Sequence, residues 1–122
     1  ADADGRFGTA QLVLNSFGSA AAAGGWASDT QYTRLVADLN GDGRADIVGF
    51  GAAGTYVSLN TGSGFGAVFL AVDSYGTSSA AGGWTNNDRF PRLLADTNGD
   101  GLADIIGFGN AGVYVSPALY DF

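Results

Sequence analysis

The chain has 122 residues, enough for one domain of ordinary size. Its 12 acidic residues are all aspartate and its five basic residues are all arginine, so the net charge is −7. Such a chain lacks the clustered cations that bind a phosphate backbone, which argues against a nucleic-acid partner. Because it has no Cys and no His, it cannot form a disulfide, a thiolate nucleophile, an imidazole base or an ordinary zinc site.

The composition predicts an all-β fold. Glycine is abundant, with 21 residues, and 12% of the chain is aromatic, whereas Glu, Lys and Met, which favour helices, are absent. No run of about 18 apolar residues is present, so we expect no membrane insertion. The sequence begins at Ala1 without an initiator Met or a signal-like apolar segment, which predicts a mature form or a fragment of a longer protein.

An internal repeat with a period of 58 residues organises the chain. Residues 24–58 and 82–116 are identical at 22 of 35 positions, and Phe7-Gly8 and Phe65-Gly66 extend the match backwards. We therefore predict a single two-repeat unit. Residues 1–23 would supply a closing outer strand and a loop, residues 24–81 the first repeat, and residues 82–122 a second repeat that lacks its outer strand.

Each complete repeat is predicted to hold four strands separated by Gly, Asn and Asp turns. The predicted strands are residues 33–37, 46–50, 55–59 and 67–73, followed by 91–95, 104–108 and 113–116. The missing eighth strand has its counterpart at residues 9–15. The runs at residues 35–37 and 93–95 are apolar throughout, which is typical of strands covered on both faces.

Four-stranded units in tandem are typical of β-propeller blades. Two blades alone would leave both outer faces exposed to solvent, so the chain is expected to close a ring with copies of itself or to belong to a longer protein. We predict an all-β fold with two four-stranded blades per chain, completed into a closed propeller by homo-oligomerisation. A six-bladed trimer is favoured over an eight-bladed tetramer.

The two repeats carry matching aspartate loops, residues 38–46 and 96–104. Oxygen side chains at positions 1, 3, 5 and 9, a glycine at position 6 and a backbone carbonyl at position 7 predict a structural calcium site in each loop. The predicted ligands are Asp38, Asn40, Asp42, Arg44 (through its carbonyl), Asp46, Asp96, Asn98, Asp100, Leu102 (through its carbonyl) and Asp104. The alternative is a pair of metal-free Asx turns, since Asp, Asn and Gly favour turns in any case.

These loops, with the strand that follows each of them, resemble the calcium-loop blades of FG-GAP (integrin-α-like) propellers. Together with Gly-Gly-Trp upstream and Ala-Gly-Thr-Tyr-Val-Ser or Ala-Gly-Val-Tyr-Val-Ser downstream, they resemble more narrowly the Psathyrella velutina lectin family. The resemblance implies a calcium-stabilised lectin that binds terminal N-acetylglucosamine and related sugars between consecutive blades. It favours an extracellular or cell-surface role.

The residues also support a sugar site independently of the resemblance. The repeated tryptophans are predicted to lie in Gly-rich loops at blade junctions, where an indole face can stack on a pyranose ring. The candidate carbohydrate-binding residues are Trp26, Trp84, Arg34, Arg92, Tyr32 and Asn110. The alternatives are that the tryptophans pack between blades and that the arginines form structural ion pairs with a neighbouring loop aspartate. Tyr56 and Tyr114 are expected to pack.

An enzyme is not expected, because the clustered aspartates are explained by the calcium spacing and no separate carboxylate pair is visible. The predicted partners are glycans with terminal N-acetylhexosamine and further copies of the chain. The alternative function is a structural or adhesive propeller fragment that binds proteins.

Overall fold

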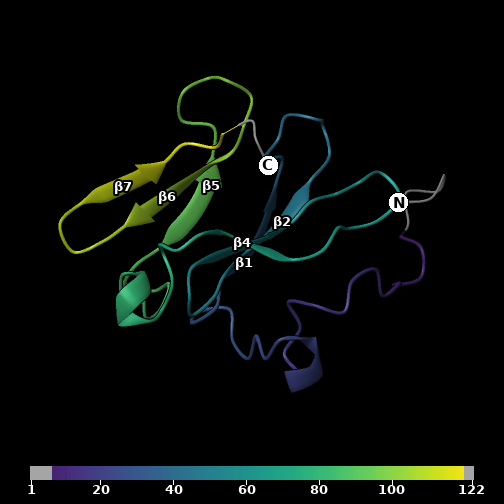
Figure 1. Cartoon of the computed structure of the whole chain (residues 1–122), viewed down its shortest axis with the longest axis horizontal. Helices are drawn as coiled ribbons and strands as arrows, with labels where there is room; N and C mark the ends of the chain where they lie inside the picture. The colour runs from purple at the N-terminus through teal and green to yellow at the C-terminus, as the bar shows by residue number, and fades with distance from the viewer. Residues whose placement is uncertain (1–6, 120–122) are drawn as a thin grey trace.

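The computed structural model describes residues 7–119. These residues form two antiparallel sheets, each a simple meander (Figure 1). The first sheet contains β1 (Arg34–Ala37), β2 (Asp46–Phe50), β3 (Thr55–Ser58) and β4 (Phe69–Val72), and the second contains β5 (Arg92–Ala95), β6 (Asp104–Phe108) and β7 (Val113–Ser116). Two single-turn 3₁₀ helices, η1 (Ala21–Ala23) and η2 (Ser79–Ala81), precede the sheets. Within this part of the chain, no helix is long and apolar enough to cross a membrane.

The all-β prediction is confirmed. Strand pairing in the two sheets has the same register at equivalent positions. Arg34 lies opposite Gly49 in the first sheet, and the equivalent Arg92 lies opposite Gly107 in the second. Strands β2, β6 and β7 have the predicted bounds, and the others are shorter than predicted. β4 is shortened most, and its pairing with β3 shifts register between Thr55 and Tyr56.

The two sheets share one apolar core. Its buried members are Leu39, Val48, Phe50, Val57, Tyr75 and Trp84. The face of the first sheet that carries Phe50 is covered by residues from the second repeat, and Phe50 is fully buried. Loop residue Leu102 also crosses to the first repeat, where a methyl group at Gly41 would lie 3.0 Å from its Cδ2.

Coverage on both faces was predicted for the apolar first strands, and the structure corrects this. Val36 on β1 is 67% exposed and Leu93 on β5 is 45% exposed. With two sheets, each has a single neighbour, so one face of each sheet stays open.

The predicted strand at residues 9–15 is also corrected, since residues 7–14 have no strand structure in this chain. A strand needs a hydrogen-bonding partner, and the free edge of β7 lies on the opposite side of the molecule from this segment (Figure 1). The rest of the predicted closing unit, residues 1–6, lies outside the described residues.

Candidate functional site

The structure contains two cavities related by the 58-residue repeat. The first, of about 540 Å³, surrounds Trp26, and the second, of about 650 Å³, surrounds Trp84. We call them the Trp26 pocket and the Trp84 pocket. Both volumes are in the range of small-ligand sites. Each is lined by the segment that precedes the Gly-Gly-Trp loop, by the loop itself, by the turn between the second and third strands, and by a tyrosine of the third strand, which is Tyr56 or Tyr114.

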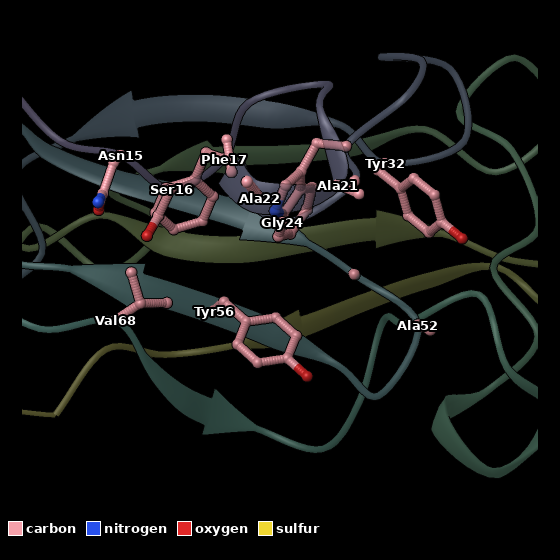
Figure 2. Close-up of a pocket in the computed structure, with 14 residues that line it drawn as sticks. Asn15, Ser16, Phe17, Ala21, Ala22, Gly24, Tyr32, Ala52, Tyr56 and Val68 are labelled. Atoms are coloured by element: carbon pink, nitrogen blue, oxygen red, sulfur yellow. The ribbon is translucent and has the colours of Figure 1, made fainter. Parts of the chain in front are cut away.

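Figure 2 shows the Trp26 pocket. The rings of Phe17 and Tyr32 lie on one side of it, and the ring of Tyr56 faces them across the gap. Asn15 and Ser16 stand at one end, whereas the hydroxyl groups of Tyr32 and Tyr56 lie toward the other (Figure 2). The pocket therefore has aromatic walls with polar groups at both ends, the arrangement of a site that orients a small amphipathic ligand.

The Trp84 pocket has the same plan with different polar groups. Asp73 replaces Asn15, Tyr75 replaces Phe17, Phe90 replaces Tyr32, and Asn110 replaces Ala52. Asn110 and Trp84, both predicted from the sequence as site residues, thus line the same pocket. Among the residues that line the two cavities, Asp73 is the sole carboxylate, so neither holds the pair of carboxylates that glycoside hydrolysis requires.

The tryptophan rings are more enclosed than an open stacking platform would be. Trp84 is 8% exposed and belongs to the core. Its ring is tilted against Tyr75 at 5.3 Å between centroids and meets Phe90 and Tyr114 edge-on at 6.0 Å. Most of the Trp84 ring is therefore packed against its neighbours, as in the alternative to sugar stacking. Tyr114, which also lines the Trp84 pocket, is 47% exposed.

Two glycines make room for each tryptophan. A Cβ at Gly107 would lie 2.6 Å from Trp84 Cη2, and a Cβ at Gly82, whose φ is +111°, would lie 2.6 Å from Trp84 Nε1. Gly49 and Gly24 occupy the same places around Trp26. Contacts this short cannot accommodate a side chain, so the glycines fix the position of the indole rings.

The two arginines that were predicted to contact the sugar do not line the cavities. Arg34 and Arg92 line neither pocket; each instead donates from Nη1 to a carbonyl, that of Phe17 at 2.9 Å and that of Tyr75 at 3.0 Å. Phe17 and Tyr75 have φ values of 60° and 63°, a left-handed conformation that costs an ordinary residue energy. Each arginine therefore donates a hydrogen bond to a residue with left-handed backbone at the edge of a pocket.

The environments of the two arginines differ. Arg34 is partly exposed, with its Nε 3.6 Å from Asp29 Oδ1. Arg92 is fully buried, and its guanidinium lies 5.2 Å from the centroid of the Phe50 ring. Burial lowers the pKa of Arg92 to about 10, and the charge of Asp29 counteracts part of this effect. At pH 7 the Arg92 guanidinium therefore remains charged.

Several pocket residues were not predicted from the sequence. Tyr56 and Tyr114 were expected to pack, yet both line the cavities. Their recurrence at the 58-residue offset was the available signal, the same one that identified the tryptophans. The segments at residues 15–17 and 73–75 gave a weaker signal, because only Ser16 and Ser74 are identical in the two copies.

The first aspartate loop gathers acceptor groups. One of the two terminal atoms of the Asn40 side-chain amide lies 3.2 Å from Asp38 Oδ1 and 3.1 Å from Asp42 Oδ1. This atom is the amide nitrogen, because a nitrogen there donates to both carboxylates, whereas an oxygen would face acceptors only. Asp38 also accepts the N–H groups of Gly41 and Gly43, the bonds of the Asx-turn alternative.

The aspartate at the ninth position of each loop accepts hydrogen bonds from backbone N–H groups instead. Asp46 is fully buried and accepts the N–H groups of Leu39 and Asn60. Asp104 is buried too and accepts those of Thr97 and Ala118, together with the Thr97 hydroxyl. In the part of the chain that the structure describes, no three acidic side chains converge in a group that could hold a metal ion.

Hydrogen bonding sets the pKa values in the second loop. The pKa of Asp96 is lowered chiefly by the N–H of Gly101, with further bonds from loop amides. At Asp104 burial raises the pKa, but the hydrogen bonds from Thr97 and Ala118 outweigh burial and lower it overall. Both groups are therefore carboxylates at neutral pH.

Comparison with known proteins agrees with this architecture. The FG-GAP-like repeat model matches residues 38–107, more than half of the chain. The chain therefore belongs to the FG-GAP-like repeat family, as its aspartate loops suggested. A comparison with curated proteins finds no significant match.

A solved structure gives the more specific likeness. The chain is similar to a lectin of Agrocybe aegerita described as recognising non-reducing terminal N-acetylglucosamine, with 42% sequence identity and a TM-score of 0.78. The match covers 91% of this chain and 26% of the lectin chain, so this chain spans about a quarter of the lectin's length.

Proposed function

We propose that the protein binds carbohydrates, with terminal N-acetylglucosamine-type sugars as ligands of the Trp26 and Trp84 pockets. The observation that carries this proposal is the 42% identity, over 91% of the chain, to a lectin that recognises non-reducing terminal N-acetylglucosamine. The aromatic lining of the pocket in both repeats supports it, because aromatic rings pack on the C–H face of a pyranose.

The chemistry of the pockets suits such a sugar. A pyranose presents a C–H face that packs on an aromatic ring, and its hydroxyl and N-acetyl groups need hydrogen-bond partners. Tyr56 and Tyr114 supply the rings that face each cavity, with Trp26 and Trp84 behind them. Asn15 and Tyr32 in one pocket, and Asp73 and Asn110 in the other, supply polar groups.

A single open pocket of this kind is expected to bind weakly, near millimolar or about −4 kcal/mol. Useful binding to a glycan-coated surface would then come from several pockets acting together, which can raise the apparent affinity by roughly 10² to 10⁴. Two pockets per chain already allow this, and a ring of chains would multiply them.

The Asn110→Ala variant tests the Trp84 pocket. We expect the affinity of this pocket for N-acetylglucosamine to fall about five-fold, the effect of losing one neutral hydrogen bond of about 1 kcal/mol. The Trp26 pocket has Ala52 at the equivalent position and should be unaffected. Titration of the labelled protein with N-acetylglucosamine, followed by NMR, resolves the two pockets.

The control variant is Ser63→Ala, which changes an exposed loop residue outside both pockets. A glycan array on the wild-type chain provides the wider test. Absence of binding to any terminal N-acetylhexosamine would contradict the proposal and would favour a protein-binding propeller fragment instead. An unchanged affinity in Asn110→Ala would show that Asn110 does not contact the sugar.

We also propose that the loops at residues 38–46 and 96–104 bind structural calcium. The recurrence of oxygen side chains at positions 1, 3, 5 and 9 of both loops supports this proposal, since calcium selects oxygen ligands. The ion would neutralise the carboxylates in each loop, where like charges about 4 Å apart cost on the order of 1 to 4 kcal/mol per pair.

Removal of calcium is expected to lower the melting temperature, because binding to the folded state alone adds RT ln(1 + [L]/Kd) to stability, about 2.7 kcal/mol at a hundred-fold excess over Kd. The measurement is thermal unfolding with and without a chelator, with readdition of calcium as the control. A melting curve that does not respond to either treatment supports metal-free Asx turns.

A further inference from the structure

One face of the second sheet repeats a surface that is buried in the first. Phe50 and Val57 are 0% and 2% exposed beneath the second repeat. Their equivalents 58 residues on, Phe108 and Val115, are 42% and 48% exposed. The second sheet therefore presents the same apolar surface as the first, without the neighbour that covers it.

The surface that would fit there is present on the first repeat. In the chain, the second repeat places the guanidinium of Arg92 over Phe50, and Arg92 Nη2 donates to the carbonyl of Gln31 at 3.3 Å. Arg34 is the equivalent of Arg92, and its side chain is 32% exposed. Val36, on the same repeat, is 67% exposed where its equivalent Leu94 packs against the core.

The edge of the second sheet is open as well. β4 (Phe69–Val72) completes the first sheet, whereas β7 is the last strand of the second. The residues 58 positions before β4 are 11–14, Gln-Leu-Val-Leu, an apolar segment in which Leu12 is 87% exposed and Val13 is 61% exposed. An unpaired edge and an exposed segment that corresponds to its missing strand are complementary.

We propose that a second copy of this chain covers this face, with residues 11–14 of that copy adding to β7 as an antiparallel fourth strand. The contact between copies then reproduces the contact between the two repeats within one chain. Pairing follows that of β3 with β4, so Val113 lies opposite Leu14, Tyr114 opposite Leu12 and Val115 opposite Gln11 of the second copy. Arg34 of that copy stands over Phe108.

This inference goes beyond the proposed sugar binding and does not depend on it. We choose a copy of the chain as the occupant because residues 11–14 correspond to the missing strand and Arg34 corresponds to Arg92, which covers Phe50. A contact of this head-to-tail kind closes into a ring or continues as a filament. Three copies would give the six-bladed ring expected from the sequence.

Engineered disulfides test the register, since the chain contains no Cys. In the variant Gln11→Cys/Val115→Cys, the two positions face each other across the proposed strand pair, within disulfide reach. In the control Gln11→Cys/Val113→Cys, one position is shifted by two residues, about 6.6 Å along the strand. We expect covalent multimers on a non-reducing denaturing gel from the first variant only.

Equal cross-linking of the two variants, or no multimers from either, overturns the proposal. A disulfide within a single chain overturns it too, because residues 11–14 would then complete their own second sheet.

The mass in solution gives an independent test. Light scattering should show wild-type particles of two or more chains, with three expected, and Phe108→Arg should reduce them to single chains by placing a cation against Arg34. Ser63→Arg, which adds the same charge to an exposed loop, should keep the wild-type mass. Phe108 is 42% exposed, so its replacement should leave the far-UV circular dichroism of the chain unchanged.

A wild-type mass of a single chain at all concentrations overturns the proposal, and so does an assembled Phe108→Arg variant. If Phe108→Arg unfolds, the disulfide pair decides, because it leaves Phe108 in place.

Discussion

Trp84→Ala is expected to destabilise the protein by about 3 to 5 kcal/mol, the usual cost of removing a buried large aromatic side chain. Trp84 is 8% exposed and touches Tyr75, Phe90 and Tyr114, so its removal leaves a cavity that these rings cannot close. Since small domains are stable by only about 5 to 15 kcal/mol, the loss is a large fraction of the total.

Thermal and urea unfolding of Trp84→Ala measure this effect, and Trp26→Ala is the matched control. Trp26 occupies the equivalent place but is only partly buried, so its replacement should cost less. Sugar binding in the Trp84 pocket should disappear with the fold around it. Unaltered stability in Trp84→Ala would instead identify the ring as the open stacking platform that the sequence suggested.

Asp104→Ala is expected to cost on the order of 3 to 5 kcal/mol even without calcium. The buried carboxylate accepts two backbone N–H groups and the Thr97 hydroxyl, and its removal leaves these donors without their partner. Unfolding in the presence of a chelator isolates this effect from any bound ion. Asp100→Ala is the control, since Asp100 is exposed and accepts the N–H of Leu102 alone.

The effect of Asp104 should also depend on pH. Its folded-state pKa is lowered from 3.8, so the carboxylate contributes stability above the ordinary pKa of aspartate, and this contribution is lost as the pH falls through the lower folded value. The difference in unfolding free energy between wild type and Asp104→Ala should therefore be full at pH 7 and shrink below about pH 4. A difference independent of pH would contradict a role for the charged group.

Much of the fold followed from the sequence because the repeat supplied two independent copies of each signal. β2 and β6 were located to the residue, since the Asp-Gly turns before them and the Phe-Gly turns after them leave no other register. The segment at residues 9–15 was predicted as a strand from its similarity to β4. The segment has no strand structure because strand pairing depends on a neighbouring strand, which similarity along the sequence does not reveal.

The site was predicted less completely, for a local reason. Spacing along the chain indicates which residues share a loop, but it does not give the direction of a long side chain. Arg34 and Arg92 turn back to carbonyls 17 residues earlier, those of Phe17 and Tyr75, whose left-handed backbone has no signature in residue type. Asn110, on a tight turn beside the pocket, has a short side chain and lies where the sequence placed it.

The loop contact of Leu102 with Gly41 has a consequence for how firmly neighbouring repeats adhere. At the contact proposed between copies, the equivalent residues are Arg44 and Gly99. Gly99 lies between Asp96 and Asp100 in the second aspartate loop. Within the chain an aliphatic side chain fills this contact, whereas between chains it would be filled by Arg44, whose Nη2 lies 3.3 Å from Asp42 Oδ2 of its own loop. Salt screens electrostatic contacts of this kind. A higher ionic strength would then weaken the contacts between protomers of the ring without unfolding the individual protomers.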